Sequence, residues 1–219
     1  MQQRFVRMAR VVDAQRHHIF ERPVSGERYV LYPIHYQPEA STLVQAPMYL
    51  DQANLLRDIA ASLPVDHRLY VKEHVTNRGR RDMAFYQALR AIPSVRLLGP
   101  DEDTWQLIRD ASAVAVITGT VGWEGVMFGR PVITFGEVFI NHHPSVLRGK
   151  EHPKDRWYEL FARAIAAHPI DRDATLALIV ALHETSRPGF IVNPDTFPEV
   201  LAPTNVNNIA DALEEALGI

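Results

Sequence analysis

The sequence predicts an α/β fold: a single doubly wound, Rossmann-like domain with a parallel sheet of about five strands. Strand-like runs alternate with helical stretches between residues 28 and 136. One run, SAVAVITG at 112–119, is almost continuously apolar, which is typical of a strand covered on both faces in a parallel sheet. A chain of 219 residues can bury the core that such a domain needs.

The predicted elements follow in order along the chain. The strands are predicted at 28–34, 67–74, 94–99, 112–119 and 131–136. Helical periodicity fills the intervals at 48–63, 80–92, 101–111 and 121–129. Repeated strand–helix units imply parallel strands with helices on both faces of the sheet. After Gly136 we expect no further strand, and the remaining predicted elements are helices at 153–168, 171–187 and 205–217.

The two ends of the chain differ from this central pattern. Residues 3–20 have the spacing of an amphipathic helix, and a break at 23–26 follows it, so residues 1–26 are predicted to be a linker-like helix. The domain is expected to span residues 27–219, with its C-terminal helices included. Between them, 188–203 is predicted to be an irregular but ordered loop, because Phe190, Ile191 and Phe197 need burial.

Composition excludes several classes of function. The net charge of -3 provides no global field for nucleic acid or an anionic membrane. The absence of cysteine excludes disulfides, thiolate metal sites and a cysteine nucleophile. No apolar run approaches the roughly 20 residues of a membrane span, and the start does not have the pattern of a signal peptide. We therefore expect a cytoplasmic protein.

The segment TGTVGWEG at 118–125 carries the first candidate site. Thr118, Gly119, Thr120 and Gly122 allow a tight turn whose amide hydrogens, with the start of the following helix, suit a phosphate group. Glu124 lies just inside that helix, where its carboxylate could bind the hydroxyls of a ribose. A turn of this kind is also common as a plain connection. The spacing matches neither the Walker pattern nor GxGxxG, so neither ATP hydrolysis nor a nicotinamide cofactor is favoured.

Other polar residues follow the predicted strands and should meet at the same edge of the sheet. Lys72 and His74 lie at the end of the second strand, where they are either a solvated strand end or a cationic pair for a phosphate. The first strand leads into HYQPEAST, which contains His35, Gln37 and Glu39. No metal site is predicted, because His142 and His143 are adjacent and have no third ligand at a suitable spacing.

Three strings together resemble a known family: YPIHYQPEAST, KEH, and TGTVGWEGVMFGRPVITFG. They are similar to the capsule polysaccharide biosynthesis glycosyltransferases, which include bacterial Kdo transferases, and more loosely to sialyltransferases that use CMP-activated sugars. The resemblance extends from about Tyr29 to Phe139. It implies a GT-B architecture of two Rossmann-like halves. This chain resembles the C-terminal, donor-binding half, so an N-terminal GT-B domain would be missing from it.

The resemblance also implies roles for individual residues. Lys72 and His74 match the basic motif at the donor phosphate, and Thr118, Gly119 and Thr120 match the turn near the phosphate and nucleoside. Glu124 matches the carboxylate that holds ribose, and His35, Gln37 and Glu39 match the loop nearest the cleft between the two halves. The family's His-Pro pair is His74-Val75 here, which departs from the pattern of CMP-Kdo enzymes.

These observations support three hypotheses. The first is the donor-binding half of an inverting, metal-independent glycosyltransferase for capsule or surface polysaccharide, in which the catalytic base comes from elsewhere. Its partners would be a nucleotide-sugar donor, for which the resemblance suggests a CMP link, a glycan acceptor and export machinery at the membrane, without nucleic acid or cofactor. The second is a nucleotide-sugar epimerase with His35 and Glu39 as its acid/base pair. The third is a non-catalytic nucleotide- or sugar-binding domain.

Overall fold

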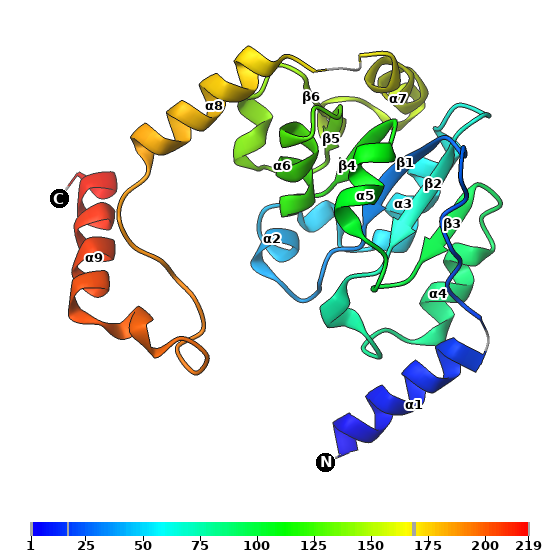
Figure 1. The fold of residues 1–219 in the computed structure, drawn as a ribbon, viewed down its shortest axis with the longest axis horizontal. Coiled ribbons are helices and arrows are strands. Elements are labelled where there is room, and N and C mark those ends of the chain that lie inside the picture. Colours follow the sequence, from blue (N-terminus) through cyan, green and yellow to red (C-terminus); the bar gives the residue numbers. More distant parts are fainter. Residues whose placement is uncertain (1, 17, 168–169, 219) are drawn as a thin grey trace. The chain divides into compact units, whose positions relative to one another are not determined.

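A six-stranded parallel sheet with helices on both faces forms the centre of the protein in a computed structural model that describes residues 2–16, 18–167 and 170–218 (Figure 1). The strands lie in the order β3-β2-β1-β4-β5-β6, and each neighbouring pair is parallel. This is the doubly wound order, with its switch point between β1 and β4. The strands are β1 (Tyr29–Pro33), β2 (Arg68–Lys72), β3 (Val95–Leu98), β4 (Ala113–Val116), β5 (Val132–Thr134) and β6 (Val146–Arg148).

The predicted fold class is confirmed, and each predicted strand is present. The prediction that the strands stop after Gly136 is wrong, because β6 pairs with β5 at the edge of the sheet. The helices are α1 (Gln2–Arg16), α2 (Ala40–Leu43), α3 (Gln52–Ala61), α4 (Met83–Arg90), α5 (Thr104–Asp110), α6 (Thr120–Met127), α7 (Trp157–Ala166), α8 (Arg172–Thr185) and α9 (Pro203–Leu217). Among the described residues, aspartates cap four of them: Asp51, Asp82, Asp103 and Asp171 accept hydrogen bonds from amides of the first turns of α3, α4, α5 and α8.

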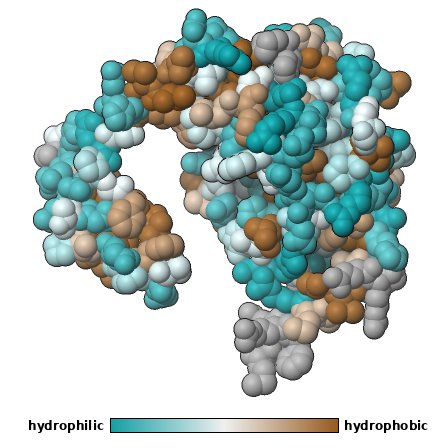
Figure 2. All heavy atoms as spheres, in the orientation of Figure 1, coloured by the Kyte–Doolittle hydropathy of each residue, from teal (hydrophilic) through white to brown (hydrophobic). Residues whose placement is uncertain are grey.

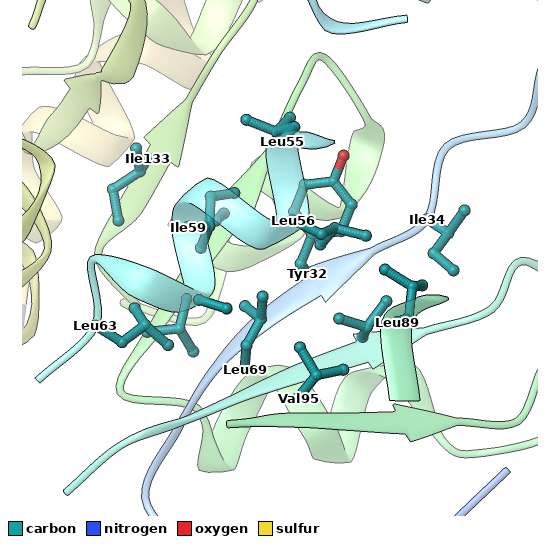
Figure 3. Close-up of a cluster of buried hydrophobic side chains, with 14 of the residues drawn as sticks. Tyr32, Ile34, Leu55, Leu56, Ile59, Leu63, Leu69, Leu89, Val95 and Ile133 are labelled. Atoms are coloured by element: carbon teal, nitrogen blue, oxygen red, sulfur yellow. The ribbon is translucent and has the colours of Figure 1, made fainter. Parts of the chain in front are cut away.

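The core lies on both faces of the sheet. Along β1, Val30 and Tyr32 belong to the cluster beneath α3, α4 and α7, whereas Tyr29 and Leu31 belong to the cluster beneath α5 and α6. Figure 3 shows part of the first cluster, in which Leu56 lies over Tyr32. Residues that alternate between two buried faces explain why the strands are apolar throughout.

Helix α6 packs unusually close to the sheet. A Cβ atom added at Gly122 would lie 2.8 Å from Val116 Cγ2 and 2.9 Å from Ile140 Cδ1. At Gly125 it would lie 3.0 Å from Val132 Cγ2. These glycines let the helix approach β4 and β5, so close packing explains Gly122 without a role in the preceding turn.

The chain forms two compact units, Met1–Thr175 and Leu176–Ile219. In the second unit, the buried Asn205 side chain accepts a hydrogen bond from the Phe190 amide and donates to the carbonyls of Phe190 and Val200. The predicted burial of Phe190, Ile191 and Phe197 is wrong, since they are 46%, 83% and 53% exposed. Backbone hydrogen bonds to Asn205 order this loop instead, and hydrophobic surface remains visible on the unit (Figure 2).

Among the helices in the described part of the chain, none has the length and apolar character needed to cross a membrane.

We predict that Gly122→Ala lowers the free energy of unfolding by about 1 kcal/mol. Overpacking costs about 1–3 kcal/mol, which exceeds the helix-propensity gain of about 1 kcal/mol. Urea denaturation measures the change, with Gly99→Ala as the control because its added Cβ would meet no heavy atom nearer than 3.7 Å. Equal losses in both variants would contradict the close approach of α6 to the sheet.

Candidate functional site

A cavity of about 480 Å³ lies at the topological switch point of the sheet, at the carboxyl ends of β1, β2 and β4. The β1–β4 ladder covers two residue pairs, Val30–Ala113 and Leu31–Val114, whereas the β1–β2 ladder covers five. Open parallel sheets bind ligands at such a switch point. The lining residues come from the segments after all three strands: Pro33, Ile34, His35, Tyr36, Glu39, Ser41, His74, Thr76, Arg80, Thr118, Gly119, Thr120 and Val121.

His35 connects the two central strands by its side chain. Its Nε2 accepts hydrogen bonds from the backbone amides of Thr118, at 3.2 Å, and Gly119, at 2.9 Å. The side chain is buried, and its Nδ1 has no hydrogen-bond partner of normal geometry. Burial lowers the pKa of His35 to about 4; the backbone of Pro33 opposes this, and His74 and Arg81 add smaller lowering effects. The two amides expected to be open to a phosphate are therefore occupied by an imidazole.

The Gln52 side chain forms hydrogen bonds with the backbone of His35. Its carboxamide oxygen accepts the His35 amide at 2.9 Å, and its nitrogen donates to the His35 carbonyl at 3.0 Å and to the Gln37 side chain at 2.8 Å. The Gln52 side chain is 2% exposed, which is unusual for glutamine and is compensated by these bonds. Sequence reasoning missed Gln52, because a polar residue directly after the cap of α3 has no distinctive pattern.

The start of α6 faces the same cavity. Gly119 is its N-cap residue and no described side chain caps the helix. Thr120 and Val121, whose amides belong to the first turn, line the cavity. A helix N-terminus carries a partial positive charge and free amide donors, which suit an anion.

A buried carboxylate orients the turn that follows β2. Glu73 is 1% exposed, and it accepts hydrogen bonds from the His74 amide, the Asn77 side chain and the Tyr86 hydroxyl. His74 in turn accepts the Thr76 amide at Nδ1, at 3.2 Å. In the neutral ring the proton is then on Nε2, which makes that atom a donor. The sequence did not single out Glu73, although it lies between two predicted site residues.

Two arginines lie beside this turn. Arg81 donates to the His35 carbonyl at 2.8 Å, lies 3.6 Å from the Glu73 carboxylate, and stacks over the Phe85 ring. Arg80 lines the cavity with its guanidinium over the Tyr36 ring. Arg80 is therefore the arginine available to an anion in this cavity.

Several predicted site residues do not line the cavity. Lys72 is buried and donates to the Pro100 carbonyl at 3.1 Å; burial lowers its pKa, with Asp101 opposing. Glu124 is half-buried in the second turn of α6, where burial raises its pKa and Trp105 opposes the change. Gln37 lines an adjacent cavity of about 390 Å³ that shares Arg80.

The remaining candidates lie at the cavity with different surroundings. Glu39 is exposed and accepts a hydrogen bond from Ser41 at 2.8 Å. Thr118 donates its hydroxyl to the Ser41 carbonyl at 3.2 Å. Within residues 2–16, 18–167 and 170–218, no group of three or more His, Asp or Glu residues could hold a metal ion.

The sequence matches a model for the "Capsule polysaccharide biosynthesis protein" family over residues 25–158, more than half of the chain. The chain belongs to this family. The resemblance that the sequence motifs indicated is thereby confirmed. A comparison with curated proteins gave no match.

Solved structures that resemble this capsule-family chain have low sequence identity. Thermosulfurimonas dismutans KpsC, beta Kdo 2,7 transferase, is 18% identical over 83% of this chain and 67% of its own, with a TM-score of 0.47. UDP-GlcNAc 2-epimerase from Methanocaldococcus jannaschii is 13% identical over 79% and 49%, with a TM-score of 0.49. Anabaena HepE in complex with UDP and glucose is 15% identical over 79% and 47%, with a TM-score of 0.45.

The chain therefore spans between 47% and 67% of the length of these solved chains. Such low identities do not carry an activity from those proteins to this one.

We predict that His35 makes stability depend on pH between about 6.5 and 4. Its folded pKa of about 4 lies below the unfolded value of 6.5, so the unfolded state binds more protons in this window. The stability that neutral His35 contributes is fully present above pH 6.5 and is lost as the pH falls through the folded pKa. The loss in the free energy of unfolding is at most about 3 kcal/mol. Urea unfolding of the wild type and His35→Gln at several pH values isolates it: the advantage of the wild type should shrink in acid. A difference that does not change with pH would contradict this protonation state.

Proposed function

We propose that this chain is the donor-binding half of a glycosyltransferase that acts in capsule or surface polysaccharide biosynthesis. The observation that carries the proposal is one cavity at the β1–β4 switch point, which joins the start of α6 to His74 and Arg80 in a chain of the capsule family. A sugar linked to a nucleoside monophosphate or diphosphate is an anion that this cavity could bind and that a polysaccharide biosynthesis enzyme would use as its donor.

The phosphate would lie against the first turn of α6. The amides of Thr120 and Val121 would donate to its oxygens, and the helix N-terminus favours the negative charge. His74 would add a donor from Nε2, and Arg80 would add a charged guanidinium from the other side. The backbone and these two side chains together form a site of the kind that recognises phosphate.

The same groups would act in the transfer step. When the glycosidic bond to the nucleotide breaks, negative charge grows on the departing phosphate, and fixed donors stabilise it more strongly than they stabilise the bound substrate. Transfer would invert the configuration at the anomeric carbon, and it would need no metal because the helix terminus and the Arg80 guanidinium would carry the charge. A base supplied by an N-terminal GT-B domain would activate the acceptor hydroxyl.

These contacts disfavour one of the two alternative functions, the epimerase, and do not separate the other from a donor-binding half. An epimerase needs an acid/base pair, but the Nε2 lone pair of His35 is engaged by two amides and Glu39 is exposed. A non-catalytic binding domain would use the same phosphate contacts, and nucleotide binding alone does not separate it from a donor half. Transfer activity after an N-terminal GT-B domain is supplied would separate them.

We predict that the nucleotide of the natural donor stabilises the protein in a thermal-shift screen of CMP, UDP, GDP and their sugars. At 100 times Kd the stabilisation should be about 2.7 kcal/mol.

His74→Ala and Arg80→Ala should each weaken binding about tenfold, since each removes a hydrogen bond to a charged group worth about 1.5 kcal/mol. Arg57→Ala is the matched control, because this exposed arginine on α3 does not line the cavity. If no nucleotide shifts the transition of the wild type, the donor-binding proposal fails.

We propose that the ribose extends beyond this cavity along α6 to Glu124, and we predict that Glu124→Gln weakens nucleotide binding about tenfold without destabilising the fold at neutral pH. A carboxylate–ribose hydrogen bond is worth about 1.5 kcal/mol. Because burial raises the folded pKa of Glu124, its ionisation opposes folding above the unfolded pKa, so the neutral glutamine should unfold at an equal or higher urea concentration at pH 7. Calorimetry and urea unfolding measure the two effects, and unchanged affinity would remove Glu124 from the ribose site.

A further inference from the structure

We propose that His35 is a positioning residue of the donor site: its neutral imidazole binds the amides of Thr118 and Gly119 and thereby fixes the first turn of α6 for the phosphate. The inference rests on the proposed donor function and adds a residue that works through the backbone rather than through the ligand. It also replaces the sequence-based hypothesis that His35 acts as an acid or base.

The hydrogen bonds determine the state of the ring. A nitrogen that accepts two amide hydrogens must carry a lone pair, so Nε2 of His35 is unprotonated and Nδ1 bears the proton. A protonated ring would place an N–H against two other N–H groups. His35 therefore cannot hold these amides and also take a proton at Nε2 from a substrate.

The surroundings hold the ring in place. Gln52 binds both backbone groups of His35, and Arg81 donates to the same carbonyl. The side chain is 6% exposed, and the Tyr32 ring lies beside it, 5.9 Å away between ring centroids. A Cβ atom at position 119 would come within 3.0 Å of Nε2, so glycine there lets the imidazole approach. Contacts from β1, α3 and the loop after β2 thus position one nitrogen atom.

In the donor site, consecutive amides would therefore have different partners: the first two bind His35, and the next two would bind the phosphate. Those of Thr118 and Gly119 are satisfied inside the protein, and the first-turn amides of Thr120 and Val121 come next along the chain. Without an acceptor at position 35, two amides beside the buried end of β4 would lose their partner, at a cost that favours a different turn. The direction of the next two N–H groups would change with it.

Two variants test this role. His35→Gln can place a carboxamide oxygen near the position of Nε2 and accept both amides, whereas His35→Leu fills similar space without an acceptor. Isothermal titration with CMP, UDP and GDP, well below each melting temperature, should give at least a tenfold larger Kd for His35→Leu. The value for His35→Gln should lie within about threefold of the wild type. Equal or tighter binding by His35→Leu would overturn the proposal, because it would mean that the imidazole blocks the phosphate site.

A structural readout separates positioning from loss of stability. On nucleotide addition, the NMR amide signals of Thr120 and Val121 should shift in the wild type and in His35→Gln, and should shift much less in His35→Leu at matched saturation. Identical shifts in all three proteins would overturn the proposal even if His35→Leu melts earlier.

Failure of the inference and failure of the donor function are distinguishable. Nucleotide binding by the wild type tests the function. Independently, nitrogen-15 NMR of the ligand-free protein at pH 7 should show His35 with its proton on Nδ1 and an acceptor at Nε2. The opposite tautomer would overturn the role of His35 while leaving the donor site standing.

Discussion

The organisation of the site depends on how two backbone amides at the end of β4 are satisfied. The β1–β4 ladder ends early, at Leu31 and Val114, and this opens the sheet edge where a ligand can enter. The amides of Thr118 and Gly119 then need an acceptor, because unpaired buried donors are costly. One imidazole supplies it from the segment that leaves β1. The strand order thus separates the ends of β1 and β4 at the switch point, and the His35 side chain connects the two segments that follow these strands.

The buried carboxylate of Glu73 likewise satisfies a backbone amide at the end of the neighbouring strand, β2. The carboxylate of Glu73 accepts hydrogen bonds from the backbone amide of the next residue, the Asn77 side-chain amide and the Tyr86 hydroxyl, and these bonds stabilise the turn after β2. That turn carries His74 and leads to Arg80, which bring a ring N–H and a guanidinium to the cavity. In the donor site that we propose, the exposed groups that would contact a phosphate are therefore supported by buried polar groups that do not line the cavity.

The sequence was sufficient for the doubly wound fold, because alternating strand and helix patterns depend on local periodicity. It was insufficient where tertiary contacts decide. Three residues of β6 are too few for a periodic signal, and Lys72 turns toward Pro100 because side chains alternate along a strand. Thr118, Gly119 and Thr120 line the cavity, but the amides of Thr118 and Gly119 donate to His35, a contact that the sequence pattern did not indicate. Gln52 and Glu73 act through backbone groups, so no motif distinguishes them.

The acid–base groups of the cavity bear on which domain would supply the catalytic base of the proposed transferase. Of its lining residues, His35 uses its lone pair within the protein, and His74 directs its own Nδ1 lone pair at the Thr76 amide. Glu39 is the lining carboxylate, and it lies exposed beside Ser41. Activation of an acceptor hydroxyl needs an acceptor within hydrogen-bond reach of that hydroxyl, ideally one protected from water. For the transferase that we propose, the described side chains of the cavity supply donors for a leaving phosphate rather than such a base, so the base would come from a second domain.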